Sequence, residues 1–158
     1  MDWEIYKKPE YYWNREMSWI SFDERILEEA RDRSLPLFER LKFLAITASN
    51  LDEFFMVRVA SIRDMMQAGI ERRDIAGLMP KEQLKQIVPK LQELMQAQYQ
   101  TYNRSLLPAL SAIHLEVISH YDRLTPSQAE AVDAYFEEHV YPVLTPMAMD
   151  SARPFPLI

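Results

Sequence analysis

Two polar side chains could carry chemistry because they interrupt hydrophobic patterns. Arg58 falls within an apolar arc that contains Phe54, Phe55 and Ile62. A buried guanidinium needs a carboxylate or carbonyl partner, so Arg58 is predicted to form an interhelical ion pair, to reach solvent, or to contact a ligand. Asn50 lies where two predicted helices meet. It could cap a helix, or its amide could bind a ligand through one donor and one acceptor.

The familiar catalytic signals are absent from the sequence. With two glycines and no cysteine, it has no Gly-rich phosphate loop, no dinucleotide fingerprint and no thiolate metal site. The acidic pairs Glu28–Glu29 and Glu137–Glu138 are adjacent on predicted helices, so their side chains point apart. The sequence has three histidines, His114, His120 and His139. They are predicted to be packed or surface residues, and His139 lies on an apolar stripe. No catalytic residue and no metal ligand is therefore predicted.

The composition indicates a globular protein that does not bind nucleic acid. The 158 residues carry a net charge of −6, with 48% hydrophobic and 27% charged residues. Nucleic-acid binding proteins cluster Lys and Arg on one face, which an acidic chain disfavours. The first eight residues include acids and no apolar stretch, and no apolar run approaches the ~20 residues that span a bilayer. A cytoplasmic location is predicted, and a parent protein that associates with membranes remains compatible with this.

Hydrophobic spacing predicts helices through the first two thirds of the chain. The first is predicted to begin at Ser21, where Glu24 completes a capping box, or at Ser18. A second begins near Pro36 and a third ends before Gly69. The predicted apolar faces are Trp19, Phe22, Ile26 and Ala30 in the first helix and Leu37, Leu41, Leu44 and Ala48 in the second. In the third they are Leu51, Phe54, Phe55, Val59, Ile62, Met65 and Met66.

Overlapping start signals predict a break between the second and third helices. Ser49 is followed three residues later by Asp52, and Asn50 is followed at the same spacing by Glu53. Two arrangements are open at this point. Ser49 caps the third helix and leaves the Asn50 amide free, or Asn50 caps it and its side-chain oxygen is occupied.

The remaining sequence predicts one long helix and then a change of character. Pro80 opens the helix, and Pro89 is predicted to kink it or to mark a split start. Its heptad-like seam comprises Leu84, Val88, Leu91, Met95, Gln98 and Tyr102. A short strand is predicted at His114–Ser119, a capped helix after Thr125, and extended chain at Tyr141–Met147. The apolar face of that capped helix is predicted to contain Val132, Tyr135, Phe136, His139 and Val140.

These elements predict a mainly α protein. We expect a lead-in at residues 1–9 and an antiparallel helical bundle over residues 10–107. Residues 108–158 are expected to hold the first elements of an α+β domain. The chain ends in apolar sequence after Arg153 with no closing element, so this second domain is predicted to be truncated.

Ordered blocks of this sequence resemble polyphosphate kinases of the phosphohistidine type. The most specific is Ser49–Arg58, with the sequence SNLDEFFMVR. The others are Asn14–Phe22 with Arg25 and Leu27–Ala30, then Leu37–Ile46, Tyr141–Pro146 and Pro154–Pro156. The last two resemble the family's second domain, called the head domain.

The resemblance implies an enzyme that reversibly moves the terminal phosphate of ATP onto polyphosphate through a phosphohistidine, with Mg²⁺. It implies that the N-terminal domain forms the upper wall of the adenine pocket, with Asn50 as the matching adenine contact. The nucleophilic histidine and the metal ligands would lie beyond Ile158. This chain is then expected to be inactive alone and to bind no cofactor tightly. ATP and polyphosphate would bind through C-terminal domains, and the head domain would form a homo-oligomer.

The composition is compatible with that division, because an acidic chain without a phosphate loop is poorly suited to stabilise a moving phosphate. An alternative function is a helical interaction or oligomerisation module with no ligand of its own, which the heptad-like seam favours. The ATP hypothesis prefers Ser49 as the cap, since an adenine edge needs both the donor and the acceptor of the Asn50 amide.

Overall fold

The computed structural model describes residues 3–148. Their regular secondary structure is helical, and they contain no strand. Contacts divide the chain into one unit of residues 1–116 and another of residues 117–158. The α-helices are α1 (Arg15–Arg31), α2 (Leu37–Glu53), α3 (Ala60–Gln67), α4 (Pro80–Thr101), α5 (Leu107–Ala112) and α6 (Pro126–Tyr135). Single 3₁₀ turns occur at Trp3–Lys7, Pro9–Tyr11, Tyr121–Arg123 and Tyr141–Val143. The predicted mainly α class and the dominance of helix over residues 10–107 are confirmed.

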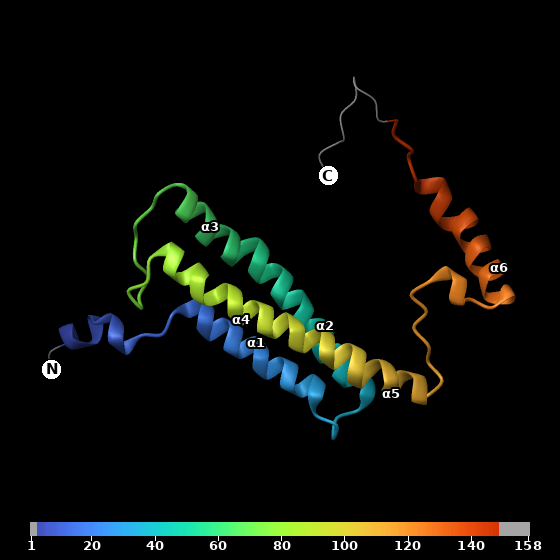
Figure 1. The fold of residues 1–158 in the computed structure, drawn as a ribbon, viewed down its shortest axis with the longest axis horizontal. Helices are drawn as coiled ribbons and strands as arrows, with labels where there is room; N and C mark the ends of the chain where they lie inside the picture. Colours follow the sequence, from blue (N-terminus) through green and yellow to red (C-terminus); the bar gives the residue numbers. More distant parts are fainter. Residues whose placement is uncertain (1–2, 149–158) are drawn as a thin grey trace. The chain divides into compact units, whose positions relative to one another are not determined.

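The first unit is an antiparallel helical bundle. α1 and α2 form a hairpin, and α4 returns beside α1 and α3 before it leads into α5 (Figure 1). Side chains from α1, α2 and α4 fill the centre, together with residues between α2 and the end of α3. This core contains Ile20, Leu27, Ala30, Leu51, Phe54, Ile62, Ile87, Leu91 and Leu94.

α1 begins earlier than the sequence predicted. Its N-cap is Asn14, whose Oδ1 accepts a hydrogen bond from the Met17 N–H at 2.9 Å, so the predicted starts at Ser18 and Ser21 are wrong. The Asn14 side chain is 2% exposed, and its Nδ2 also donates to Asp74 Oδ2 at 2.7 Å. A distant loop therefore makes this cap more favourable than the local capping box.

The buried face of α1 also differs from the predicted stripe. Phe22 was expected in the core and is 47% exposed, while the adjacent Asp23 is fully buried. The buried positions are Glu16, Ile20, Asp23, Leu27 and Ala30, and they share one helical face. Polar residues on this face hid it from a search for apolar spacing.

The predicted break at Ser49–Asn50 is wrong. α2 continues through π-helical turns at Phe54–Val59 directly into α3, and neither Ser49 nor Asn50 caps a helix. An N-cap needs extended backbone, whereas Glu53, Val59 and Ala60 keep helical dihedral angles. Thr47, Leu51 and Phe54 form one continuous buried face across the expected break, so tertiary packing overrides the local start signals.

Gly69 ends α3 as predicted. It has a φ of +67°, which places it in the left-handed region that a Cβ disfavours. The Ile70 N–H donates to the Met65 carbonyl at 2.9 Å, and the Gly69 N–H donates to the Met66 carbonyl at 3.2 Å. These two bonds form a Schellman motif, which satisfies carbonyls at the end of the helix.

α4 begins at Pro80 as predicted, but its buried face coincides with the predicted seam at only two positions. Leu91 and Gln98 are buried on the observed face, whereas Val88 and Met95 are exposed. The observed face is Pro80, Gln83, Ile87, Leu91, Leu94, Gln98 and Thr101. Pro89 lies within one continuous helix on its exposed side, so no split start occurs. Polar Gln83 and Thr101 belong to the buried face of α4. A search for apolar spacing therefore does not find the helical phase of this face.

The second unit contains α6 and short turns. Thr125 caps α6, and Gln128 completes the predicted capping box. The strand predicted at His114–Ser119 is wrong, because His114 has a φ of +62° and a strand needs a pairing partner that the described residues do not provide. Tyr141–Val143 forms a 3₁₀ turn within the stretch predicted to be extended. The block at Pro154–Pro156 lies outside the described residues.

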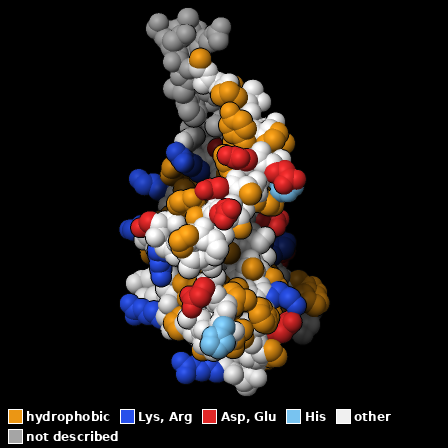
Figure 2. All heavy atoms as spheres, turned by 90° about the vertical axis from the view of Figure 1, so that its right-hand side faces the viewer, with side chains coloured by type: hydrophobic (Ala, Val, Ile, Leu, Met, Phe, Trp, Pro, Cys, Tyr) orange, Lys and Arg blue, Asp and Glu red, His pale blue; other side chains and the backbone are white. Residues whose placement is uncertain are grey.

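The apolar face predicted for α6 packs against no core among the described residues. α6 continues into a π-helical turn at Phe136–Val140. The side chains of Val132, Tyr135 and Phe136 are exposed. Hydrophobic side chains are visible among acidic ones at the molecular surface in Figure 2. Within residues 3–148, no helix has both the length and the apolar character needed to cross a membrane.

Replacing the observed cap should weaken the fold more than replacing the predicted one. Asn14→Ala removes the α1 cap and the hydrogen bond to Asp74, and we expect it to lower the free energy of unfolding by about 2 kcal/mol. The exposed Ser18→Ala variant is the matched control and should change it by less than about 0.5 kcal/mol. Urea denaturation measures both, and equal losses would contradict the assignment of Asn14 as the cap.

Candidate functional site

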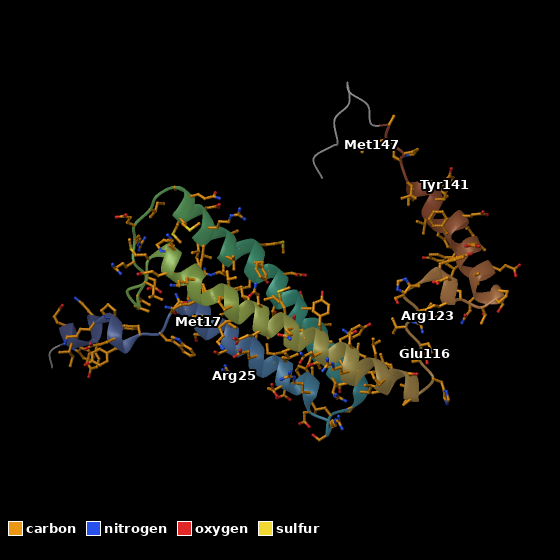
Figure 3. The ribbon with its side chains drawn as sticks, viewed as in Figure 1. Met17, Arg25, Glu116, Arg123, Tyr141 and Met147 are labelled. Atoms are coloured by element: carbon orange, nitrogen blue, oxygen red, sulfur yellow. The ribbon has the colours of Figure 1, made fainter. Side chains whose placement is uncertain are left out.

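A cavity of about 310 Å³ opens between α1 and the continuous helix formed by α2 and the Phe54–Val59 turns. It contains Asn50, the site residue predicted from the sequence. The residues around it are Arg15, Glu16, Trp19, Asn50, Glu53, Phe54, Val57 and Arg58. Three of these side chains come from the first turns of α1. Figure 3 labels Met17 in this part of the helix and Arg25 further along it.

An aromatic pair forms the apolar wall of this cavity. The rings of Trp19 and Phe54 are stacked, with centroids 4.1 Å apart and an angle of 11° between their planes. Phe54 is fully packed into the core and Trp19 is half-buried. The wall is therefore rigid on the core side and accessible on the cavity side, an arrangement that suits contact with a flat apolar ligand.

Asn50 lines the cavity with part of its amide already bonded. Its Nδ2 donates to Asp23 Oδ1 across the α1–α2 contact at 2.9 Å. Its Oδ1 accepts no hydrogen bond from any described residue. The amide is thus not consumed in a helix cap, and its oxygen and one N–H hydrogen have no partner among the described residues.

Asp23 is the partner that the sequence did not reveal. The carboxyl group is fully buried, and its Oδ2 has no hydrogen-bond partner among residues 3–148. Burial raises the pKa of Asp23 above its usual range, and the hydrogen bond from Asn50 opposes that rise. The sequence did contain a signal for the burial of Asp23, because this residue lies in helical phase with Ile20, Leu27 and Ala30.

Arg58 forms the ion pair that its position predicted. It donates through Nη2 to Glu16 Oε1 on α1, and Arg15 Nε lies 3.5 Å from the same oxygen. The prediction that Arg58 is largely buried is wrong, since its side chain is 36% exposed while that of Glu16 is 7% exposed. Arg58 lies in the π-helical turns beside the exposed Val57, between the buried core residues Phe54 and Ile62.

Positive charge gathers next to the cavity. A second cavity of about 520 Å³ shares Arg15, Glu16 and Arg58 with the first. It also contains Arg72 and Arg73, so its lining has four arginines and two acids, Glu16 and Asp74. In a chain with a net charge of −6, this is a local excess of positive charge in the second cavity, whereas the cavity of Asn50 has two arginines and two acids, Glu16 and Glu53.

None of the three histidines is among the residues that line this cavity. His114, His120 and His139 are exposed, and His139 contacts the ring of Tyr135 with centroids 4.7 Å apart. His139 was expected to be packed or at a boundary, and its exposure contradicts that expectation. In the part of the chain that the structure describes, no three His, Asp or Glu side chains lie together as a metal site would require.

Comparisons with known proteins agree on one family. Residues 12–118 match the family described as polyphosphate kinase N-terminal domain, and residues 127–158 match the polyphosphate kinase middle domain. A polyphosphate kinase of Bacillus anthracis is 51% identical over 149 residues, covering 94% of this chain and 21% of the relative. One from Lactiplantibacillus plantarum is 50% identical over 153 residues, covering 97% of this chain and 21% of the relative.

A solved structure extends the agreement to the fold. The crystal structure of polyphosphate kinase from Porphyromonas gingivalis matches with a TM-score of 0.74 and 32% identity. The match covers 92% of this chain and 20% of that one. The chain therefore spans about a fifth of the length of the relatives that it matches.

The Glu16–Arg58 pair should stabilise the wall of the cavity. Arg58→Ala leaves a buried carboxylate with only the more distant Arg15, so we expect it to lower the free energy of unfolding by about 1–3 kcal/mol. In a double-mutant cycle with Glu16→Gln, the coupling energy should be at least ~1 kcal/mol. Chemical denaturation of the four proteins measures it. A coupling energy near zero would show that the pair adds nothing to stability.

Proposed function

This chain belongs to the polyphosphate kinase family, and from that premise we propose that it supplies one wall of the ATP site of such an enzyme. The complete enzyme would transfer the terminal phosphate of ATP reversibly to polyphosphate. The observation that carries the proposal is the cavity lined by both Asn50 and the stacked rings of Trp19 and Phe54.

The base of the nucleotide would be held by Asn50 and Trp19. An adenine edge presents a hydrogen-bond donor beside an acceptor, and the Asn50 amide offers the complementary pair. The Trp19–Phe54 wall provides an apolar surface for the ring, although one wall cannot exclude water from it alone. In this proposal, residues 10–107 form the domain that carries the site, and residues 108–158 begin the head domain through which the enzyme forms an oligomer.

The phosphates would extend from the base toward Arg15 and Arg58. These two side chains border both cavities, so they lie between Asn50 and the arginine-rich side. Guanidinium groups bind phosphate oxygens through paired hydrogen bonds. Arg58 would remain bonded to Glu16 and offer its remaining N–H groups, which its partial exposure leaves accessible.

The transfer of phosphate would occur elsewhere in the enzyme. Phosphoryl transfer needs metal and positive charge arranged around the moving group. The described residues do not suit Mg²⁺, because they bring no three acidic or histidine side chains together. We therefore assign Mg²⁺ and the phosphorylated histidine to domains beyond this chain.

The alternative, an interaction module built on the seam of α4, has less support. The buried face of α4 packs against α1 and α3 of the same chain, which occupies Leu91 and Gln98 from the predicted seam. These two side chains are not available to a partner helix, and only Val88 and Met95 of the seam are exposed.

Asn50→Ala, made in a polyphosphate kinase that carries this chain as its N-terminal part, should mainly raise the KM for ATP. Loss of a neutral hydrogen-bonding group costs about 0.5–1.5 kcal/mol, so a several-fold rise is expected with little change in kcat. Ser49→Ala is the matched control because Ser49 is an exposed neighbour outside the cavity lining. A KM unchanged by Asn50→Ala, together with lower stability, would reduce Asn50 to a structural residue.

The chain alone should form no polyphosphate. Incubation of the 158-residue protein with ATP and Mg²⁺, followed by measurement of polyphosphate and of acid-labile phosphate on protein, tests this. Product formation, or a stable phosphohistidine at any of its three histidines, would contradict the assignment of the chemistry to other domains.

A further inference from the structure

Asp23 fixes the direction in which the Asn50 amide faces. Asn50 donates its NH₂ group to Asp23 Oδ1, and a carboxyl oxygen that carries no proton can only accept. The contact is 2.9 Å long and joins two helices, and Asp23 is fully buried beneath it. Rotation of the amide by 180° would place two oxygens against each other. The oxygen of Asn50 is therefore directed away from Asp23.

The cost of burying Asp23 shows that this contact is unusual. Its Oδ2 has no partner within the described part of the chain, and an unpartnered buried polar group lowers stability. Burial also raises its pKa, so the charged form is disfavoured where it lies. An apolar residue at this position would continue the core face of Ile20 and Leu27 without that cost. Stability alone does not explain a carboxyl group here.

We propose that Asp23 is a positioning residue that makes the site select purine bases with an amino group at carbon 6. This rests on the proposed ATP function of Asn50. With its NH₂ group held by Asp23, Asn50 presents its oxygen and one remaining N–H hydrogen to the cavity. The 6-amino group of adenine donates to that oxygen, and an adjacent ring nitrogen accepts from the hydrogen.

A 6-oxo purine presents the opposite pattern. Inosine has an acceptor oxygen at carbon 6 and a donor N–H beside it. Against an amide held by Asp23, acceptor meets acceptor and donor meets donor. A rotated amide would accept inosine instead, so discrimination depends on the group that prevents rotation.

The test compares ATP with inosine triphosphate in a polyphosphate kinase that carries this chain. In Asp23→Asn, the new amide can either accept from Asn50 or donate to it, so both orientations of Asn50 become available. We expect the ratio of kcat/KM for ATP to that for inosine triphosphate to fall by about ten-fold, with the value for inosine triphosphate rising. A merely structural role would lower both values together and leave the ratio unchanged, which would overturn the proposal.

Two further variants make the outcome specific. Thr47→Val removes a buried hydroxyl that donates to the Leu44 carbonyl at 2.8 Å on the same helix, so it should lower stability without changing the ratio. Asp23→Leu removes the hydrogen-bond partner of Asn50 while continuing the apolar face of Ile20 and Leu27, so it should fold and lower the ratio as Asp23→Asn does. If Asp23→Asn does not fold, Asp23→Leu decides alone. A folded Asp23→Leu variant that keeps the full preference for ATP would overturn the proposal.

Failure of this inference is distinguishable from failure of the proposed function. If Asn50→Ala raises the KM for ATP but Asp23→Asn leaves the ratio unchanged, Asn50 contacts the base and Asp23 does not orient it. If Asn50→Ala leaves the KM for ATP unchanged, the ATP function of the cavity fails, and this inference fails with it.

Discussion

The fold of the first unit depends on polar side chains buried within the apolar face of α1. Glu16 and Asp23 lie on that face and are bonded to the continuous helix that follows, and Asn14, the N-cap of α1, is bonded to Asp74. A buried polar group without a partner costs about 1–3 kcal/mol, so these bonds restrict how α1 can pack. Apolar packing alone would tolerate rotation or sliding of the helices much better.

Two of these bonds involve residues that line the cavity. Glu16 holds Arg58 at one edge, and Asp23 holds Asn50 at another. Between them, the Trp19–Phe54 stack joins α1 to the start of the π-helical turns. π-helical turns inserted in α-helices often occur at functional sites. Here they contribute Phe54 to the core and Val57 and Arg58 to the lining of the proposed ATP site.

Resemblance to a family and reasoning from residue types contributed differently to the function. Spacing alone left Asn50 as a cap or a ligand contact and left Arg58 with three possible roles. The family blocks pointed to ATP, and the structure then placed Asn50 and Arg58 in one cavity. The structure also added Asp23 and Trp19, which neither form of reasoning had assigned to the site. Both belong to α1, whose buried face the apolar pattern had placed wrongly.

The sequence by itself determined the helical class, the ends marked by strong local chemistry, and the family. Gly69 ends α3, and Thr125 caps α6, because a left-handed backbone and a capping box are decided within a few residues. Tertiary structure alone decided the start of α1, the continuity of α2 into α3, and the partner of Asn50. At Asn14, Thr47 and Asp23 the outcome depends on residues far along the chain or on a shared core. Where local preferences differ by about 1 kcal/mol, burial and long-range hydrogen bonds are large enough to override them.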